Sequence, residues 1–338
     1  MYYSIVHLVD DASLGGVNRM LDFIGGSPEL ARTGLHKIVR VRRGQLSAPK
    51  FSADMVVSHL SICWANLPLF AALRAAHPRT PLVHIEHSYC ERFVALAVKN
   101  TDRFETLMRS VMAIFDHVVA VSETQGRWLK RKGYCPGGRL IVIEPCVDLV
   151  PFFATLPRAV GNPRIVGVVG RAEDQKGLDI LVEAFRDDRL KYLELHIYGG
   201  GSLLEALKTQ AGNHANIVFK GFTNNPAAAM AACDVIAMPS RWEPYGLVAL
   251  EAMAASRPLV CSRVDGLDTH IAGGAIEVAT NTPGGWVEVL SALPNIDLDL
   301  ATTRGRLTAQ AARKRFIVAW TDLIQKVART QDDERLAA

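Results

Sequence analysis

The chain has 338 residues, of which 49% are hydrophobic and 21% charged, and its formal net charge is +4. This composition excludes a disordered chain and predicts a globular protein long enough for two domains. No segment resembles a signal peptide, no apolar run is as long as a membrane span, and the six cysteines are scattered without a C-x-x-C pair. These features predict a cytoplasmic protein with free thiols.

Apolar segments with strand character alternate with helical segments along the chain. The first half has predicted strands at residues 3–9, 36–41, 55–59, 82–86, 117–121 and 140–144. The second half has them at 165–169, 193–198, 217–220, 235–238 and 259–262, with helices at 178–185, 203–211, 227–232 and 247–255. This alternation predicts an α/β fold with two Rossmann-like domains, each a parallel sheet covered by helices on both faces. The expected ligand site is the cleft between the domains, at the carboxyl ends of the strands.

The two patterns meet at a Pro-containing segment of weak periodicity, residues 151–163. We therefore predict a first domain over 1–155 and a second over 156–310, followed by a helical tail over 311–338. The tail carries apolar residues at helical spacing, including Phe316 and Trp320.

Positive charge is concentrated in the first half, where residues 1–150 hold 18 Lys and Arg against 13 Asp and Glu. The excess comes from two clusters: Lys37, Arg40, Arg42, Arg43 and Lys50; and Arg127, Lys130, Arg131, Lys132 and Arg139. A solvated basic face and contact with an anionic membrane surface both fit such clusters. Sparse aromatic residues and the absence of a recognisable module argue against nucleic acid as a partner.

The most informative segment runs from Asp234 to Glu251. An apolar strand leads into a Pro- and Gly-containing loop that carries Glu243, and a helix begins at about Gly246 and carries Glu251. A helix N-terminus favours a bound anion, so a phosphate is expected over the amides of Tyr245, Gly246 and Leu247. Two carboxylates beside it suit sugar and ribose hydroxyls, which indicates a pocket for a nucleotide-activated sugar.

Glu243 and Glu251, separated by seven residues and joined by Pro244, Tyr245, Gly246, Leu247 and Val248, resemble the E-x7-E motif of retaining GT-B glycosyltransferases of family 4. The resemblance implies a donor domain in the second half and an acceptor-side domain in the first. It also implies that the last helix returns to the first domain. The co-substrate would be a nucleoside diphosphate sugar, with no cofactor and no metal.

Other second-half residues fit this family. Gly170 and Arg171 follow a predicted strand, and Lys176 precedes a helix, which resembles the family's glycine-arginine and lysine-glycine element. Two cations at a strand end would stabilise a departing diphosphate. Gly199 and Gly200 resemble the glycine pair that lets the nucleotide approach closely.

The first-half signals are weaker. Gly15 and Gly16, in the stretch from Ser13 to Arg19, resemble the family's N-terminal double-glycine loop near donor and acceptor. His87 follows a strand and resembles the family's histidine near the transferred sugar, although a packed structural histidine is the alternative. Glu86 is either a pairing partner or the base that receives the acceptor proton.

Some segments depart from the family pattern. The run Val264 to Asp268 replaces a glycine-glycine-x-x-glutamate element, and Pro145 to Asp148 replaces an asparagine-glycine-valine-aspartate element. The pair Asp297 and Asp299 has the spacing of a metal-binding motif, but its place before the last helix favours a helix start.

Taken together, the residues and the resemblance predict a retaining, metal-independent hexosyltransferase. Its catalytic residues would be His87, Arg171, Lys176 and Glu243, and its acceptor a glycan or a lipid-linked molecule. The basic first domain suggests cell-envelope or exopolysaccharide synthesis at the inner face of the cytoplasmic membrane. The alternatives are a GT-B sugar-nucleotide epimerase or phosphorylase, and a non-catalytic membrane-attached scaffold.

Overall fold

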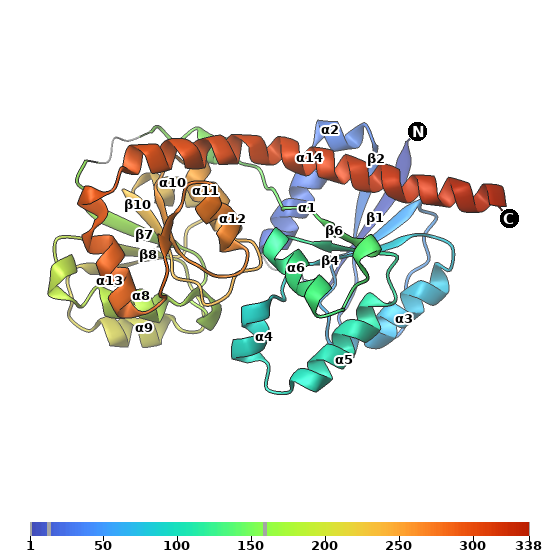
Figure 1. Cartoon of the computed structure of the whole chain (residues 1–338), viewed down its shortest axis with the longest axis horizontal. Helices are drawn as coiled ribbons and strands as arrows, with labels where there is room; N and C mark the ends of the chain where they lie inside the picture. Colours follow the sequence, from blue (N-terminus) through green and yellow to red (C-terminus); the bar gives the residue numbers. More distant parts are fainter. Residues whose placement is uncertain (1, 12–14, 158–160, 338) are drawn as a thin grey trace. The chain divides into compact units, whose positions relative to one another are not determined.

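The computed structural model describes residues 2–11, 15–157 and 161–337. The chain divides into two compact units (Figure 1). Unit 1 comprises Met1–Asp148 and Ala312–Ala338, and unit 2 comprises Leu149–Ala311. Each unit has one six-stranded sheet in which every neighbouring pair of strands is parallel.

The sheet of unit 1 has the strand order β2-β1-β3-β4-β5-β6. Its strands are β1 (Tyr3–Val9), β2 (Gly34–Arg40), β3 (Met55–Ser58), β4 (Leu82–Glu86), β5 (His117–Ala120) and β6 (Leu140–Val142). Its helices are α1 (Gly16–Gly26), α2 (Pro28–Ala31), α3 (Leu67–Ala76), α4 (Glu91–Ala97), α5 (Thr101–Met112) and α6 (Glu123–Arg131). Side-chain caps start several helices: Asn100 accepts a hydrogen bond from the Arg103 amide, and Ser122 accepts one from the Gln125 amide.

The sheet of unit 2 has the strand order β12-β11-β10-β7-β8-β9. Its strands are β7 (Ile165–Val169), β8 (Glu194–Tyr198), β9 (Ile217–Gly221), β10 (Val235–Met238), β11 (Leu259–Ser262) and β12 (Ile276–Val278). Its helices are α7 (Val150–Phe153), α8 (Leu178–Ala184), α9 (Leu204–Ala211), α10 (Pro226–Ala231), α11 (Leu247–Ala254), α12 (Leu267–Ala272) and α13 (Pro283–Ser291).

The long helix α14 (Leu298–Ala337) contributes to both units, with its residues up to Ala311 in unit 2 and the following ones in unit 1. In unit 1, Phe316 packs on Phe23 with ring centroids 5.7 Å apart, and Trp320 lies 5.6 Å from His7. Arg313 of the same stretch pairs with Glu29 at 2.8 Å. The described part of the chain contains no helix with both the length and the apolar character needed to cross a membrane.

The predicted α/β class and parallel sheets are confirmed, and all eleven predicted strands occur to within a few residues. The strand β12 at the edge of unit 2 was not predicted. Its three residues alternate apolar and polar side chains as a strand does, but the run is too short for this alternation to predict a strand. All six cysteines lie within the described residues and carry free thiols, and five of them are buried.

Candidate functional site

Unit 2 has a topological switch point between its two central strands. Strands β8 and β9 lie on one side of β7, whereas β10, β11 and β12 lie on the other. Connections that leave in opposite directions open a crevice at the carboxyl ends of β7 and β10, the usual ligand site of such sheets. The loops that follow these two strands are residues 170–177 and 239–246, and they contain the predicted site residues Gly170, Arg171, Lys176, Glu243, Tyr245 and Gly246.

The conformation of the 239–246 loop depends on two glycines. Gly246 has φ of +95°, and a Cβ atom there would lie 2.8 Å from Cδ2 of Leu267. Gly266 lies against the loop so closely that a Cβ atom would meet the Pro244 carbonyl oxygen. Both positions therefore require glycine, since one has a left-handed backbone and the other has no room for a side chain.

The loop ends where α11 begins, with Gly246 as its N-cap and no side-chain cap. The first amides of this eight-residue helix, including those of Leu247 and Val248, have no partner within the helix and form a site for negative charge. Tyr245 is buried, and its carbonyl oxygen accepts a hydrogen bond of 3.1 Å from His270 Nε2. Glu251, one turn into the helix, is 1% exposed.

Lys176 and Glu243 form an ion pair beside this helix. The distance from Lys176 Nζ to Glu243 Oε2 is 2.5 Å, and the two side chains are 20% and 9% exposed. Ser240 donates a hydrogen bond of 3.2 Å from its hydroxyl to the same carboxylate oxygen. Lys176 also lines a small pocket at the ends of β7 and β10, together with Gly170, Ser240 and Val248.

The remaining predicted donor residues lie on the neighbouring loops. The Arg171 side chain is exposed just after β7. Hydrogen bonds from Ser202 lower the pKa of Glu173, and the positive charge of Arg171 lowers it further. Gly199 has φ of +145°, and a Cβ atom there would collide with the Gly170 carbonyl oxygen. A Cβ atom on Gly200 would meet nothing within 4 Å, so Gly200 leaves open space beside the loop.

Several residues that sequence reasoning did not identify hold the 239–246 loop in place. Arg241 forms a bidentate pair with Asp179 at 2.5 and 2.8 Å, which ties the loop to α8. The Asn281 amide donates hydrogen bonds of 3.1 Å to the carbonyls of Pro239 and Ser240. Asp265, in the segment that departs from the family pattern, has φ of +43° and accepts a hydrogen bond of 3.3 Å from the Glu243 amide. No local sequence signal identifies these residues, because their partners are 22 to 62 residues away.

In unit 1, Gly15 is the N-cap of α1 and Gly16 is its first residue. The preceding loop residues Ser13 and Leu14 lie outside the described residues. Asn18 donates a hydrogen bond of 3.1 Å from its side chain to the Asp11 carbonyl. The predicted double-glycine element therefore starts the first helix of the unit.

Glu86 and His87 follow one another at the end of β4 but have different environments. The Glu86 carboxylate is buried, accepts hydrogen bonds of 2.7 and 2.9 Å from the Ser88 and Tyr89 amides, and lies 3.7 Å from His84 Nε2. These contacts favour the pairing alternative for Glu86. His87 is half-buried, its Nε2 lies 2.9 Å from Nδ1 of His59, and burial lowers its pKa to about 4.

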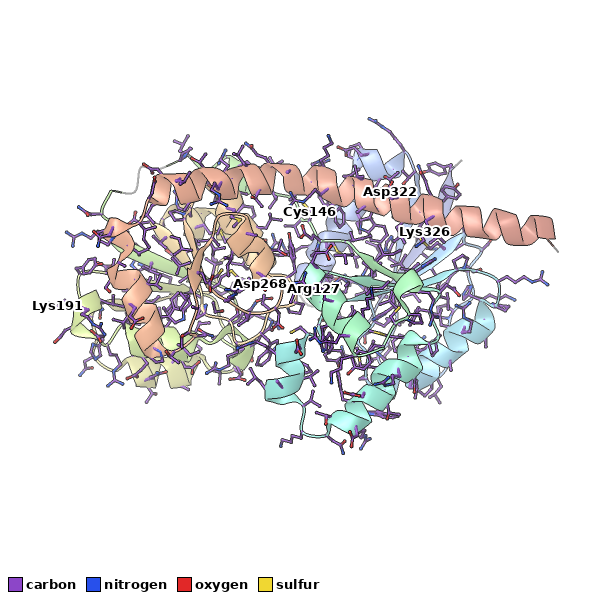
Figure 2. The ribbon with its side chains drawn as sticks, in the orientation of Figure 1. Arg127, Cys146, Lys191, Asp268, Asp322 and Lys326 are labelled. Atoms are coloured by element: carbon purple, nitrogen blue, oxygen red, sulfur yellow. The ribbon has the colours of Figure 1, made fainter. Side chains whose placement is uncertain are left out.

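The basic clusters of unit 1 are partly neutralised. Arg43 pairs with Asp10 at 3.0 Å, Arg131 with Glu91 at 2.5 Å and Lys132 with Glu105 at 2.9 Å. Other cations of the clusters are exposed, such as Lys37 on β2. Arg127 on α6 is exposed as well, and Figure 2 labels its side chain. The first cluster therefore keeps its charge mainly along β2 and the loop after it.

Asp297 accepts a hydrogen bond of 2.8 Å from the Leu300 amide, and Asp299 lies in the first turn of α14. This is the helix start that the sequence favoured. Within the described ranges, no group of three or more His, Cys, Asp or Glu side chains has an arrangement that could hold a metal ion.

Comparisons with known proteins identify the class of protein. HepE of Anabaena, solved in complex with UDP, has a TM-score of 0.71 at 17% identity, covering 98% of this chain and 100% of HepE. Sucrose-phosphate synthase of Thermosynechococcus elongatus has a TM-score of 0.70 at 20% identity, covering 99% and 100%. The two parallel α/β units with their C-terminal helix thus have the GT-B fold of glycosyltransferases, as expected.

Sequence relatives identify the family. Residues 17–150 match the family described as Glycosyltransferase Family 4, and residues 163–294 match the family described as Glycosyl transferases group 1. The D-inositol 3-phosphate glycosyltransferase of Xylanimonas cellulosilytica is 32% identical over 267 residues, covering 70% of this chain and 63% of the relative. That of Nocardia farcinica is 30% identical over 251 residues, covering 64% and 54%. The chain belongs to the family 4, group 1 glycosyltransferases, and it spans 54% to 63% of the length of these two curated relatives.

Proposed function

We propose that this chain is a retaining, metal-independent hexosyltransferase. It transfers a sugar from a nucleoside diphosphate sugar, bound by unit 2, to a glycan or lipid-linked acceptor on the side of unit 1. The observation that carries the proposal is the crevice at β7 and β10, where the uncapped N-terminus of α11, the Lys176–Glu243 pair and the buried Glu251 lie on adjacent elements.

In this proposal the diphosphate binds at the N-terminus of α11. The amides of Tyr245 to Leu247 donate hydrogen bonds to it, and Arg171 and Lys176 neutralise the charge that grows as it departs. Lys176 has three ammonium protons, so it can donate to a phosphate oxygen while it stays paired with Glu243. The exposed guanidinium of Arg171 can bind two phosphate oxygens at once.

The carboxylates bind hydroxyl groups. Glu251 accepts hydrogen bonds from the ribose, and Glu243, one oxygen of which is used by Lys176 and Ser240, accepts hydrogen bonds from the sugar ring through the other. Gly15, Gly16 and His87 of unit 1 contact the acceptor and the transferred sugar. The acceptor oxygen bonds to the anomeric carbon on the face that the diphosphate leaves, which retains the anomeric configuration. The bond from that carbon to the diphosphate oxygen breaks, and the hydroxyl proton passes to the departing diphosphate.

The names of similar proteins suggest the first substrates to test. HepE structures are described with UDP and with UDP-glucose, so a uridine donor comes first. The names of the curated relatives contain D-inositol 3-phosphate, so this compound should be tested as an acceptor beside glycans and lipid-linked sugars. The exposed cations of unit 1 support an acceptor in an anionic membrane, reached from the cytoplasmic face during cell-envelope or exopolysaccharide synthesis.

Thermal unfolding of the purified chain with UDP, GDP, ADP and their sugar conjugates, in the presence of EDTA, tests the donor site. A ligand at a hundredfold excess over its dissociation constant stabilises the folded protein by about 2.7 kcal/mol, which gives a clear rise in midpoint. We expect this rise with one nucleotide, its loss in Glu251→Gln, and its retention in Glu205→Gln, which alters an exposed carboxylate of α9.

The reaction itself separates the alternatives. Mass spectrometry of mixtures with donor and acceptor is expected to detect a glycosylated acceptor. A product formed without an acceptor, or with inorganic phosphate alone, would instead indicate an epimerase or a phosphorylase. A chain that binds none of the nucleotides would refute the donor site and favour the scaffold.

A further inference from the structure

Four histidine rings of unit 1 form a continuous chain of hydrogen bonds. His36 Nδ1 lies 3.0 Å from His7 Nε2, His7 Nδ1 lies 3.0 Å from His59 Nε2, and His59 Nδ1 lies 2.9 Å from His87 Nε2. Successive rings are stacked, with centroids 5.2 to 5.3 Å apart. His7 and His59 each use both ring nitrogens within the chain.

The strand order explains how residues so distant in sequence meet. His36 is on β2 and His7 on β1, while His59 and His87 directly follow β3 and β4, and these strands are neighbours in this order. The chain of rings therefore crosses four strands and ends at the carboxyl edge of the sheet, where His87 lies. Trp320 of α14 packs against His7 and His36, on the other side of β1 from the core residues Val6 and Leu8.

The four rings are neutral at pH 7. Burial lowers the pKa of His7 to about 3 and those of His36 and His87 to about 4, and it lowers the pKa of His59 well below its usual value. A neutral imidazole has one N–H group, so four rings carry four protons. Three of these protons occupy the three hydrogen bonds, and the fourth must lie at one end of the chain.

This proton count leaves two arrangements. Either every ring carries its proton on Nε2, and His87 Nδ1 is an acceptor, or every ring carries it on Nδ1, and His87 Nδ1 is a donor. If the two forms were mixed along the chain, two facing ring nitrogens would have either no proton between them or two protons. In both cases one buried hydrogen bond would be lost. The tautomer of each ring is therefore coupled to that of the others.

The two ends of the chain differ in their surroundings. His36 Nε2 is buried and completes no hydrogen bond within the described residues. Burial lowers the pKa of the His36 ring, and the nearby Leu30 carbonyl has a smaller, opposite effect on it. A carbonyl oxygen attracts an N–H group and repels a bare ring nitrogen, which favours protonated Nε2 atoms along the chain. At the other end, the half-buried His87 makes no hydrogen bond through Nδ1 within the described residues.

We propose that His36, His7 and His59 are positioning residues that fix the ring plane and the tautomer of His87, so that its Nδ1 presents a lone pair to a sugar or acceptor hydroxyl. The identity of that hydroxyl rests on the function proposed above. The coupling of the four rings does not.

The coupling can be read in the wild-type protein by long-range ¹H–¹⁵N NMR of histidine rings, because the two ring nitrogens of a fixed neutral tautomer resonate far apart. We expect His7, His36, His59 and His87 to share the Nε2–H form at pH 7.5. Different tautomers among these four rings would overturn the proposal, and this measurement needs no variant that could fail to fold.

His36→Phe removes the far end of the chain while it keeps an aromatic ring on an edge strand. We expect the tautomer ratio of His87, three rings away, to change roughly fivefold or more, as the loss of one net hydrogen bond implies. His117→Phe is the matched control, since His117 is a half-buried strand residue of the same unit outside the chain. An unchanged His87 ratio in folded His36→Phe would overturn the coupling.

Kinetics then test positioning separately from donor binding. We expect His36→Phe to lower kcat several-fold and to leave nucleotide stabilisation unchanged, whereas His117→Phe alters neither. An unchanged kcat would refute the positioning role. Failure of all nucleotides to bind would refute the proposed function, but the NMR result would stand.

Discussion

The Lys176–Glu243 pair gives a quantitative test of how the candidate donor site is held together. The Lys176→Met variant keeps most of the aliphatic side chain and removes the ammonium group. The Glu243 side chain, which is 9% exposed in the wild type, then has one neutral donor, the Ser240 hydroxyl at 3.2 Å. The perturbation therefore leaves a buried carboxylate without its opposite charge.

The size of the effect follows from burial. Removing one partner of a fully buried ion pair costs about 3–5 kcal/mol. Lys176 is 20% exposed and the Ser240 hydroxyl remains, so we expect about 2–3 kcal/mol for unit 2. Glu243→Gln should cost about 1 kcal/mol, because the lysine left behind can turn to water. The double variant should be more stable than the sum of the two changes predicts.

Hydrogen exchange of β7 and β10 amides is a suitable assay, because it reports on unit 2 without requiring that the two units unfold together. Lys208→Met provides the control, since its partner Glu205 is a surface residue and the expected change is within about 0.5 kcal/mol. If these amides exchange as slowly in Lys176→Met as in the wild type, leaving Glu243 without its opposite charge does not destabilise unit 2, and our prediction is wrong.

Two further predictions concern the loop and the histidines. Gly246→Ala should destabilise unit 2 by about 2 kcal/mol, because φ is +95° and Leu267 occupies the space for a Cβ atom. The variant should also lose the nucleotide-induced thermal shift. A normal shift would contradict our assignment of the α11 N-terminus as the diphosphate site. Acidification should destabilise unit 1. The pKa of His7 is about 3 in the folded chain and about 6.5 in the unfolded chain. The unfolded chain therefore binds more protons than the folded chain as the pH falls below about 6.5, and this favours unfolding. Between pH 7 and pH 5, His7 alone should lower the free energy of unfolding by about 2 kcal/mol. Hydrogen exchange of the β1 amides, corrected for the intrinsic effect of pH, measures this loss as faster exchange. Equal protection at both pH values would contradict a neutral buried ring.

The fold was largely predictable because its determinants are local. Strands such as β7 and β10 are short apolar runs bounded by glycine, proline or polar residues, and the helices between them have clear helical spacing. The three-residue β12 lacks these signals. Its strand conformation depends on pairing with β11, which no pattern in the sequence encodes.

The site was predictable where a compact motif carried it. Glu243, Gly246 and Glu251 lie within nine residues, so a strand, a loop and a helix N-terminus could be inferred together. The supporting residues Asn281 and Asp179 contact the same loop from distant segments, which only tertiary folding brings near. The histidine chain was missed for the same reason, since its hydrogen-bonded partners are 28 to 52 residues apart and strand prediction does not give strand order.

The assignment of α14 to both units has a consequence for biosynthesis. The core of unit 1 includes Phe23 and His7, which are made first, but Phe316 and Trp320, which cover them, are made after all of unit 2. At a translation rate of roughly 5–20 residues per second, the interval between Asp148 and Val327 lasts on the order of ten to forty seconds. Unit 2 can complete its own sheet within that time, whereas in nascent unit 1 the faces of Phe23 and His7 that Phe316 and Trp320 cover stay exposed to solvent.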